Sequence, residues 1–400
     1  MSIKICLIID DYLPNSKKVA AKMMHELACE FISLGHKVTV ITPNSDMNTK
    51  MKISDIEGVK VCYFKSGAIK NTSKFKRLIN ETLLSFNAKR ICLKYLQDRP
   101  HDLIIYYSPT IFFGTLVKTL KKTWSAKSYL ILRDFFPQWA IDNKLIKPNS
   151  LISKYLQFFE KINYDNADII GVMSPKNLQW FNNYYQQPKK VEVLYNWVND
   201  RTTVSKTKDY KQLLALTDKL VFFYGGNIGH AQDMSNIVRL AINMQECPKV
   251  FFVLVGDGDE VKLVKKLIKS KNLTNMLILP AVSQSDYIQM LLSFDVGLFS
   301  LSKHHQTHNF PGKLLSYIQY GLPILGSVNK GNDLEQIINS YNAGLISVNG
   351  NDQSFFGNAK KLLDEKTRDK LKNNASFLQK KYFSVQCAVK QLLRNKLLAK

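Results

Sequence analysis

Residues 3–43 read IKICLIIDDYLPNSKKVAAKMMHELACEFISLGHKVTVITP, and their pattern predicts the architecture of the chain. A short apolar run ends in Asp10 and Asp11, which is typical of a buried strand followed by a loop. Apolar residues then recur at helical spacing as far as Gly35, and the branched run at 38–43 predicts a second strand. A strand, a helix and a strand in succession form a βαβ unit, which implies a parallel sheet.

The same alternation of apolar runs and helical stretches continues along the chain. Further short runs predict strands at 59–64, 102–108, 128–135, 168–174 and 191–196. Residues 199–216 are polar and poor in branched apolar residues, and we interpret them as a linker. Strand and helix patterns then resume from Lys219.

These patterns predict an α/β protein with two doubly wound domains, at 1–198 and 199–375, and a basic helical segment at 376–400. A chain of 400 residues exceeds the roughly 250–300 residues at which single cores stop growing. Two such domains imply a cleft between them, and doubly wound sheets bind ligands at the carboxyl ends of their strands. Polar or glycine-rich segments at strand ends are therefore the candidate sites.

Composition limits the environment of the protein. The net charge of +24, from 56 Lys and Arg against 32 Asp and Glu, implies a polyanionic neighbour such as a nucleic acid, an anionic membrane or a phosphorylated substrate. The six cysteines form no CxxC pair, which is typical of a reducing compartment. No apolar run approaches the roughly 18 residues of a membrane span. We expect a cytoplasmic protein that its charge holds at a membrane surface.

A glycine turn follows the first strand of the second domain, where Gly225, Gly226 and Gly229 separate an apolar run from a helix. Glycines allow a tight turn and the close approach of a phosphate, although the spacing is not that of a dinucleotide site. An ordinary turn is the alternative. A second glycine turn carries Asp257 and Asp259, which could accept from ribose hydroxyls or cap a following helix; for Asp259 we favour capping.

The stretch 308–326, HNFPGKLLSYIQYGLPILG, places Lys313 between a Pro-Gly turn and a helix. A helix N-terminus carries partial positive charge and free N–H groups, and the added ammonium suits a diphosphate. An ordinary solvated lysine is the alternative. The preceding loop holds His304, His305 and His308 without a cysteine or carboxylate beside them, and we expect no metal.

Polar and charged residues also follow two predicted strands of the first domain. Arg133 and Asp134 end one apolar run, where they could serve function or form a local ion pair. Asn15, Ser16 and Lys17 lie in the loop after the first strand, where they could face a ligand or be solvated. No G-x-S-x-G, Walker A motif or catalytic cysteine–histidine context occurs, so a hydrolase or an NTPase is not supported.

Five segments, taken in order, resemble the GT-B glycosyltransferases of family 4, which use nucleotide-sugar donors. They are LGHKVTVITP at 34–43, VLYNWVND at 193–200, YGGNIG at 224–229, VLVGDG at 253–258, and the stretch from LPAVSQSDYIQMLLSFDVGLFSL at 279–301 to NFPGKLLSYIQYGLPILG at 309–326. The resemblance covers residues 1 to about 390 and is greatest to bacterial O-antigen and capsule transferases of the N-acetyl-L-fucosamine type. It implies two Rossmann-like domains with an interdomain cleft.

The resemblance implies a donor site in the second domain, where the family's glycine turn cradles the donor diphosphate. The family also has a basic pair after this turn and a glutamate pair before the Gly-x-Pro. Here Asn227 and Gln232 stand in place of the basic pair, and His308 and Ser316 stand in place of the glutamates. We expect Lys313 to substitute for the basic pair by stabilising the leaving nucleotide diphosphate. The full donor set is Gly225, Gly226, Asn227, Gly229, Asp257, Asn309, Gly312, Lys313, Ser316 and Tyr317, with Ser316 and Tyr317 at the ribose.

The first domain is then expected to bind the acceptor. The resemblance gives Asp134 the role of base or orienting group, with Arg133 beside it, and Asn15, Ser16 and Lys17 contact the acceptor. The expected reaction moves N-acetyl-L-fucosamine from a UDP-linked donor to a polyprenyl-diphosphate-linked saccharide in O-antigen or capsule assembly. Neither a cofactor nor a nucleic acid is expected to take part.

The positive charge is expected to hold the enzyme on the anionic inner face of the cell membrane. The basic helical stretches at 261–271 and 377–400 are the candidates for this contact, at about 1 kcal/mol for each well-placed cation. Two other functions stay open: a sugar-nucleotide epimerase of the GT-B type, and a catalytically inactive binding or scaffold protein.

Overall fold

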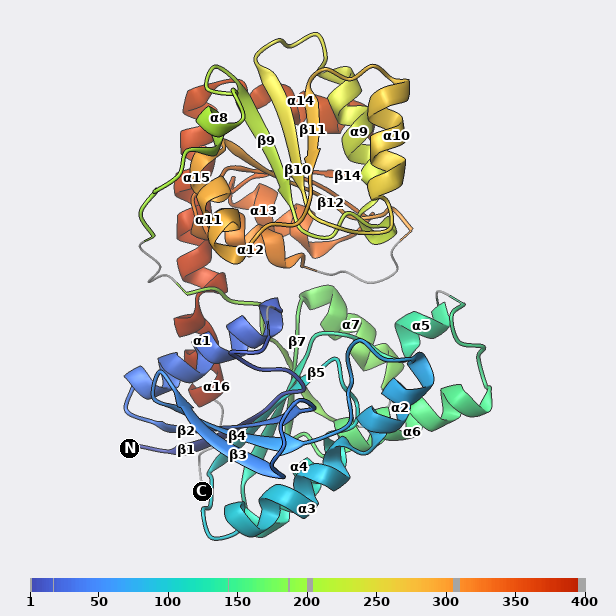
Figure 1. Ribbon diagram of the computed structural model, residues 1–400, viewed down its shortest axis with the longest axis vertical. Coiled ribbons are helices and arrows are strands. Elements are labelled where there is room, and N and C mark those ends of the chain that lie inside the picture. Colours follow the sequence, from blue (N-terminus) through green and yellow to red (C-terminus); the bar gives the residue numbers. More distant parts are fainter. Residues whose placement is uncertain are drawn as a thin grey trace. The chain divides into compact units, whose positions relative to one another are not determined.

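The computed structural model describes residues 2–16, 18–142, 144–185, 188–199, 204–304 and 310–394. The chain divides into two compact units, which we treat separately. The first comprises residues 1–195 together with the chain from 385 onward, and the second comprises residues 196–384. In both units, parallel strands alternate with helices, so the expected α/β class is confirmed (Figure 1).

The first unit contains an eight-stranded sheet with the order β3-β4-β2-β1-β5-β6-β7-β8. Its strands are β1 (Lys4–Ile8), β2 (Lys37–Asn44), β3 (Met51–Ile56), β4 (Val59–Lys65), β5 (Leu103–Ser108), β6 (Lys127–Leu132), β7 (Ile169–Val172) and β8 (Lys190–Val193). Its helices are α1 (Val19–Ser33), α2 (Lys74–Thr82), α3 (Leu84–Leu96), α4 (Gly114–Trp124), α5 (Gln138–Asp142), α6 (Leu151–Asp165), α7 (Pro175–Tyr184) and α16 (Val385–Arg394).

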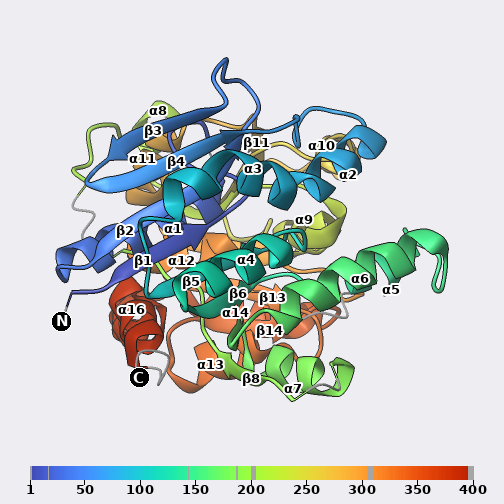
Figure 2. The same ribbon diagram turned by 90° about the horizontal axis from the view of Figure 1, so that it is seen from below.

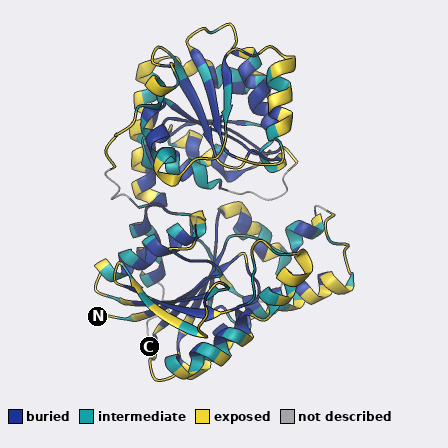
Figure 3. Cartoon of the chain, in the orientation of Figure 1, coloured by how far each residue is buried: buried dark blue, intermediate teal, exposed yellow. Residues whose placement is uncertain are grey.

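Helices cover both faces of this sheet, which explains the continuous apolar runs of its central strands. On one face α3, α4 and α6 pack side by side, and on the other α1 packs against α16 (Figures 1 and 2). Residues 5–8 of β1 and all of β5 are buried between these layers (Figure 3). Strands buried on both faces are typical of parallel sheets.

The edge strand β3 was not expected from the sequence. It pairs antiparallel with β4, and its burial pattern shows no buried residue. An edge strand of this kind is held by backbone hydrogen bonds to one neighbour, so it carries no apolar run that sequence periodicity could detect.

The second unit contains a six-stranded parallel sheet with the order β11-β10-β9-β12-β13-β14. Its strands are β9 (Leu220–Gly225), β10 (Val250–Val255), β11 (Met276–Leu279), β12 (Val296–Ser300), β13 (Ile324–Val328) and β14 (Leu345–Val348). Its helices are α8 (Tyr210–Leu213), η1 (His230–Gln232), α9 (Met234–Asn243), α10 (Val261–Ser270), α11 (Gln284–Ser293), α12 (Gly312–Gln319), α13 (Asp333–Ser340), α14 (Asp352–Lys361), α15 (Glu365–Leu378) and η2 (Gln379–Phe383).

The structure shifts the expected domain boundaries. The first unit ends at Tyr195 rather than at residue 198, and the expected separate segment at 376–400 does not exist as a unit. Its first part, through η2, belongs to the second unit. Helix α16 returns to the first unit because its apolar face, which includes Val389 and Leu392, is buried there and packs against α1.

Among the described residues, no helix combines the length and the apolar character that crossing a membrane would require.

Candidate functional site

The glycine turn ends β9, a buried strand at the centre of the second sheet. Gly226 has a φ of +128°, a conformation that residues with side chains rarely adopt. At Gly225 a Cβ would lie 2.3 Å from the ring of Tyr287, and at Gly229 a Cβ would lie 2.6 Å from Asn227 Nδ2. Backbone conformation thus favours glycine at 226 and packing against the Tyr287 ring favours it at 225, whereas the side chains around Gly229 are flexible at their ends.

The second glycine turn, after β10, packs directly against the first. The amide of Gly226 donates to the carbonyl of Val255 at 2.9 Å, and that of Ile228 donates to the carbonyl of Asp257 at 2.8 Å. At Gly256, where φ is +154°, a Cβ would lie 1.8 Å from the carbonyl oxygen of Gly226. Asp257 supports the turn through its backbone carbonyl. Its side chain is exposed, and the expected contact of this side chain with a donor stays a prediction.

Two carboxylates occupy the helix starts beside these turns. Asp259 accepts from the amide of His230 at 3.1 Å, and Glu260 accepts from the amide of Met234 at 3.0 Å. The prediction that Asp259 caps the following helix is wrong, because α10 has no side-chain cap and Asp259 accepts instead from the first residue of η1.

Lys313 lies in the first turn of α12, and its side chain reaches the glycine turn. A Cβ on Gly226 would lie 3.5 Å from Lys313 Cε and 3.7 Å from Nζ. The ammonium lies 3.6 Å from the centroid of the Tyr224 ring, whose face attracts a cation. Burial lowers the pKa of Lys313 to about 7. Lys313 is therefore not the freely solvated lysine that the sequence also allowed.

Tyr317 anchors the glycine turn from the inside. It is fully buried, and its hydroxyl donates to the carbonyl of Leu298 at 2.9 Å and accepts from the amide of Gly225 at 3.3 Å. Its ring fills the space over Gly297, where a Cβ would lie 2.3 Å away. The prediction that Tyr317 contacts a ribose is wrong, because its position on α12 turns it into the core.

The other expected donor residues surround this turn. The side chains of Asn227 and Gln232 bind each other, with Nδ2 donating to Oε1 at 2.8 Å. Gly312 begins α12, and the half-buried Ser316 hydrogen-bonds to Tyr287. Their contacts with a donor stay predictions.

Arg133 follows β6, and its guanidinium serves the backbone. It donates to the carbonyls of Leu132 at 3.4 Å, Gly171 at 3.3 Å and Tyr195 at 3.4 Å, and burial lowers its pKa to about 10. These carbonyls follow or lie within neighbouring strands. Arg133 thus holds neighbouring strand ends, and its expected role in catalysis stays a prediction.

Asp134 lies at the carboxyl edge of the first sheet. Burial raises the pKa of its carboxyl group to about 6, and the neighbouring backbone of Phe135 opposes this rise only in part. Asp10, which follows β1, also has its pKa raised by burial. Both carboxylates act electrostatically on Tyr107 at the end of β5, so they share this edge. The sequence offered Asp10 as a strand end, but its burial was not visible there.

Polar groups of the loop after β1 form hydrogen bonds with one another. The buried Ser16 donates from Oγ to Asp11 Oδ2 at 2.6 Å and accepts from the amide of Lys18 at 3.1 Å. Asp11 also forms an ion pair with Lys70 at 2.6 Å. The expected acceptor contact of Ser16 is wrong, because its hydroxyl is engaged within the loop. Asn15 is exposed, and its acceptor contact stays a prediction.

Four positions singled out in the sequence, Lys17, His305, His308 and Asn309, lie outside the described residues. The described neighbour, His304, donates its amide to Ser302 Oγ at 3.4 Å.

Comparisons with known proteins agree with this arrangement. The family model Glycosyltransferase Family 4 matches residues 20–202, and the family model Glycosyl transferases group 1 matches residues 205–376. In HepE of Anabaena, solved in complex with UDP and glucose, the same fold is seen: the TM-score is 0.69 at 14% identity, over 98% of both chains.

Two curated relatives are similar over part of their length. WcaI of Escherichia coli (strain K12), provisionally assigned to colanic acid biosynthesis as a glycosyl transferase, is 23% identical over 260 residues, which are 63% of each chain. The N-acetylgalactosamine-N,N'-diacetylbacillosaminyl-diphospho-undecaprenol 4-alpha-N-acetylgalactosaminyltransferase of Campylobacter jejuni subsp. jejuni serotype O:2 is 25% identical over 242 residues. That alignment covers 60% of this chain and 62% of the relative, so more than a third of each relative is unmatched.

The two units, each built on a sheet of mainly parallel strands flanked by helices, define a two-domain α/β protein. The two family models match consecutive parts of the chain, one for each unit. The chain belongs to the GT-B glycosyltransferases and, within them, to family 4.

Proposed function

We propose that this glycosyltransferase takes a sugar from a nucleoside diphosphate bound at the glycine turn of the second unit and transfers it to an acceptor bound by the first unit. The observation that carries the proposal is the ammonium of Lys313, which lies beside Gly226 and over the ring of Tyr224. Burial is the cause of its lowered pKa, and no carboxylate among the described residues offsets it. A buried charge is costly unless an opposite charge balances it, and a donor diphosphate supplies that charge.

The chemistry follows from where charge develops. When the bond between the anomeric carbon and the diphosphate oxygen breaks, negative charge grows on the leaving diphosphate. The ammonium of Lys313 and the N-terminus of α12 stabilise that charge from fixed positions. In the first unit, Asp134 accepts or orients the proton of the acceptor hydroxyl, since a pKa near 6 leaves it ionised at neutral pH and still basic.

For the donor we propose UDP-N-acetyl-L-fucosamine, and for the acceptor a saccharide on a polyprenyl diphosphate in O-antigen or capsule assembly. The sequence resemblance supports the sugar, and the UDP in the HepE structure supports the nucleotide. The Campylobacter relative, whose name specifies a saccharide on diphospho-undecaprenol, supports the acceptor.

A panel of nucleotides tests the donor. UDP, GDP and TDP and their sugars, including UDP-N-acetyl-L-fucosamine, are added to the protein, and the melting temperature and sugar release are measured. We expect one nucleotide class to raise the melting temperature, because a ligand stabilises the folded state that it binds. Slow release of its sugar completes the expected result. Isomerisation of the sugar without an acceptor would indicate an epimerase, and no response to any nucleotide would indicate a scaffold.

We further propose that the first unit docks on the anionic membrane surface through an apolar face formed by α2 and α6, here termed the α2–α6 face. Its largest exposed side chains are Phe75 at 72%, Leu151 at 89% and Phe158 at 60% exposure. A contact of 2.8 Å between Thr82 Oγ1 and the Tyr155 hydroxyl joins the two helices. Exposed apolar side chains that gather in this way mark an interaction surface.

The charge around the α2–α6 face indicates that its partner is an anionic membrane surface. Exposed basic side chains flank the apolar ones on both helices: Lys74, Lys76 and Arg77 on α2, and Lys154 and Lys161 on α6. Aromatic and aliphatic side chains beside lysines suit the boundary between acyl chains and anionic headgroups. In α16 the apolar face is buried in the first unit while Lys390 and Arg394 are exposed, and the expected membrane contact through its cations stays a prediction.

Vesicle flotation tests the α2–α6 face. We expect the protein to float with phosphatidylglycerol vesicles and to sink with phosphatidylcholine vesicles. The triple variant Phe75→Ser, Leu151→Ser, Phe158→Ser is expected to lose flotation. A matched triple variant of exposed apolar residues in the second unit, Leu213→Ser, Leu363→Ser, Phe377→Ser, is expected to keep it. Equal behaviour of the two variants, or no flotation of the unaltered protein, would contradict the proposal.

A further inference from the structure

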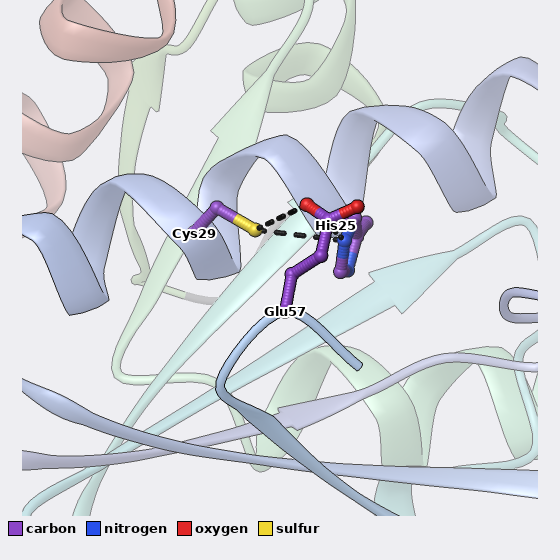
Figure 4. A group of neighbouring side chains, drawn as sticks. All are labelled: His25, Cys29 and Glu57. Atoms are coloured by element: carbon purple, nitrogen blue, oxygen red, sulfur yellow. Dashed lines mark hydrogen bonds and ion pairs between the residues drawn. The ribbon is translucent and has the colours of Figure 1, made fainter. Parts of the chain in front are cut away.

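His25, Cys29 and Glu57 form a cluster within the first unit. His25 and Cys29 lie one helical turn apart on α1, and Glu57 reaches them from the turn between β3 and β4 (Figure 4). One ligand atom from each residue lies within 4.8 Å of the other two. The imidazole of His25 is buried, whereas the side chain of Glu57 is 76% exposed, so an ion can enter from the Glu57 side.

The distances within the cluster are those between ligands of one metal ion. Cys29 Sγ lies 3.5 Å from His25 Nε2 and 3.8 Å from Glu57 Oε2, and the nitrogen and the oxygen are 3.4 Å apart. Zinc binds nitrogen at about 2.0–2.1 Å, sulfur at about 2.3 Å and oxygen at about 2.0–2.2 Å. At tetrahedral angles these bonds separate sulfur from nitrogen by about 3.5–3.6 Å, sulfur from oxygen by about 3.5–3.7 Å and nitrogen from oxygen by about 3.3–3.5 Å.

Without an ion, the three groups contact one another directly. Cys29 Sγ lies within hydrogen-bonding distance for sulfur of both partners, and His25 pairs with Glu57 at 3.4 Å. The separation of 3.4 Å exceeds the usual N–H···O range of about 2.7–3.2 Å, so the same three atoms are also spaced for an ion at their centre.

Tyr12 completes the arrangement around His25. Its hydroxyl lies 2.8 Å from His25 Nδ1. A neutral imidazole that binds a metal through Nε2 carries its proton on Nδ1, and it usually donates this proton to an oxygen that fixes the ring. The Tyr12 oxygen is in place to accept it.

The backbone of Glu57 supports a ligand role. Its φ is +52°, and that of the next residue, Gly58, is +80°, so the two form a hairpin turn with positive φ at both central positions. Asn, Asp and Gly are favoured at the first of these positions, and a longer side chain is unusual there. The glutamate at this position brings a carboxylate within reach of α1.

We propose that His25 Nε2, Cys29 Sγ and Glu57 Oε2 bind a zinc ion, with water in the fourth position. The thiol of Cys29 releases its proton to solvent on binding, and the thiolate, imidazole and carboxylate then form bonds to the ion. The ion joins the β3–β4 hairpin to α1, which stabilises the edge of the first sheet. This site was not expected from the sequence, because the spacing of His25 and Cys29 by itself is an ordinary feature of a helix.

Cobalt and zinc binding to the full-length protein test the site. Co²⁺ is expected to bind with one equivalent and to show the absorption of a tetrahedral ion and a thiolate-to-cobalt charge-transfer band. Zn²⁺ is expected to abolish both and to raise the melting temperature with increasing concentration. In weakly buffered solution, binding should release about one proton, because zinc binds the thiolate and the Cys29 thiol must lose its proton.

Three variants locate the ion. Cys29→Ser is expected to lose the charge-transfer band and the zinc-dependent shift, whereas Cys247→Ser, which alters a partly exposed cysteine of the second unit, is expected to keep both. Tyr12→Phe should weaken zinc binding about 10–100-fold. The proposal is overturned if Co²⁺ gives no thiolate band, or if the band survives in Cys29→Ser. Because no nucleotide is involved, failure here leaves the proposed function untouched.

Discussion

Replacement of Lys313 by alanine is expected to lower kcat/KM about 10²–10³-fold, the effect of removing one fixed group that stabilises charge in the transition state. Most of the loss should fall on kcat, because the charge on the leaving diphosphate grows as the bond to the sugar breaks. Lys313→Met keeps an apolar stem over the ring of Tyr224 and should show a similar loss. Steady-state kinetics with the donor found in the nucleotide panel provide the measurement.

Lys360 offers a matched control for this variant. It also lies over an aromatic ring, with Nζ 4.6 Å from the centroid of Phe356, but it is exposed on α14. Lys360→Ala should leave both kcat and KM unchanged. Full activity of Lys313→Ala would exclude Lys313 from the mechanism.

The lowered pKa of Lys313 also predicts that the affinity for the donor depends on pH. Without a ligand, the lysine loses its proton as the pH rises through about 7, whereas the unfolded chain keeps the proton to about 10.4. The donor diphosphate favours the ammonium, so binding above pH 7 must take up a proton. We therefore expect donor affinity to fall as the pH rises above 7, by at most tenfold for each pH unit, and Lys313→Met to lack this fall.

Replacement of Asp134 by asparagine is expected to lower kcat about 10²–10⁴-fold, the usual contribution of a general base. A base must be ionised, so the rate of the unaltered enzyme should fall as the pH drops through about 6, and this acid limb should be absent in Asp134→Asn. The pH profile of kcat is the measurement. An unchanged rate, or an acid limb that persists, would remove Asp134 from the mechanism.

The free energy of unfolding distinguishes a catalytic role of Asp134 from a structural one. Because burial raises the pKa of Asp134, its ionised form destabilises the folded state above pH 6. Asp134→Asn should therefore not lower the free energy of unfolding at pH 8. Glu160 is the matched control: it is buried, has a pKa raised to about 7, and accepts from Tyr164 at 3.0 Å and Tyr184 at 2.9 Å. Glu160→Gln should leave the acid limb in place.

Much of the fold was predictable because continuous apolar runs report burial on both faces of a parallel strand. The runs at 3–9, 102–108 and 220–225 contain the strands β1, β5 and β9. The helix predicted between the apolar runs at 3–9 and 38–43 is α1. The edge strand β3 was not predictable in this way. It is held by backbone hydrogen bonds to β4, and those depend on the position of a neighbour rather than on the side chains of β3.

The candidate site was likewise predictable from the sequence only in part. The glycine turn and Lys313 were identifiable because strand ends and helix starts leave local signatures in the sequence. The contacts of Tyr317, Ser16 and Arg133 were not identifiable from the sequence, because each of these polar groups binds a partner that only folding supplies. The hydroxyl of Tyr317, for example, donates to the carbonyl of Leu298. The same residue types could equally have faced a ligand.

The sequence by itself determined the alternation of strands and helices, the mainly parallel sheets and the strand ends at which the candidate residues lie, since hydrophobic periodicity acts over a few residues. Only the tertiary structure decided that Lys313 lies against Gly226 and Tyr224, and that Glu57 meets His25 and Cys29. These contacts join segments far apart in the chain. Their distances depend on how helices pack on the sheets, which the local pattern of side chains does not specify.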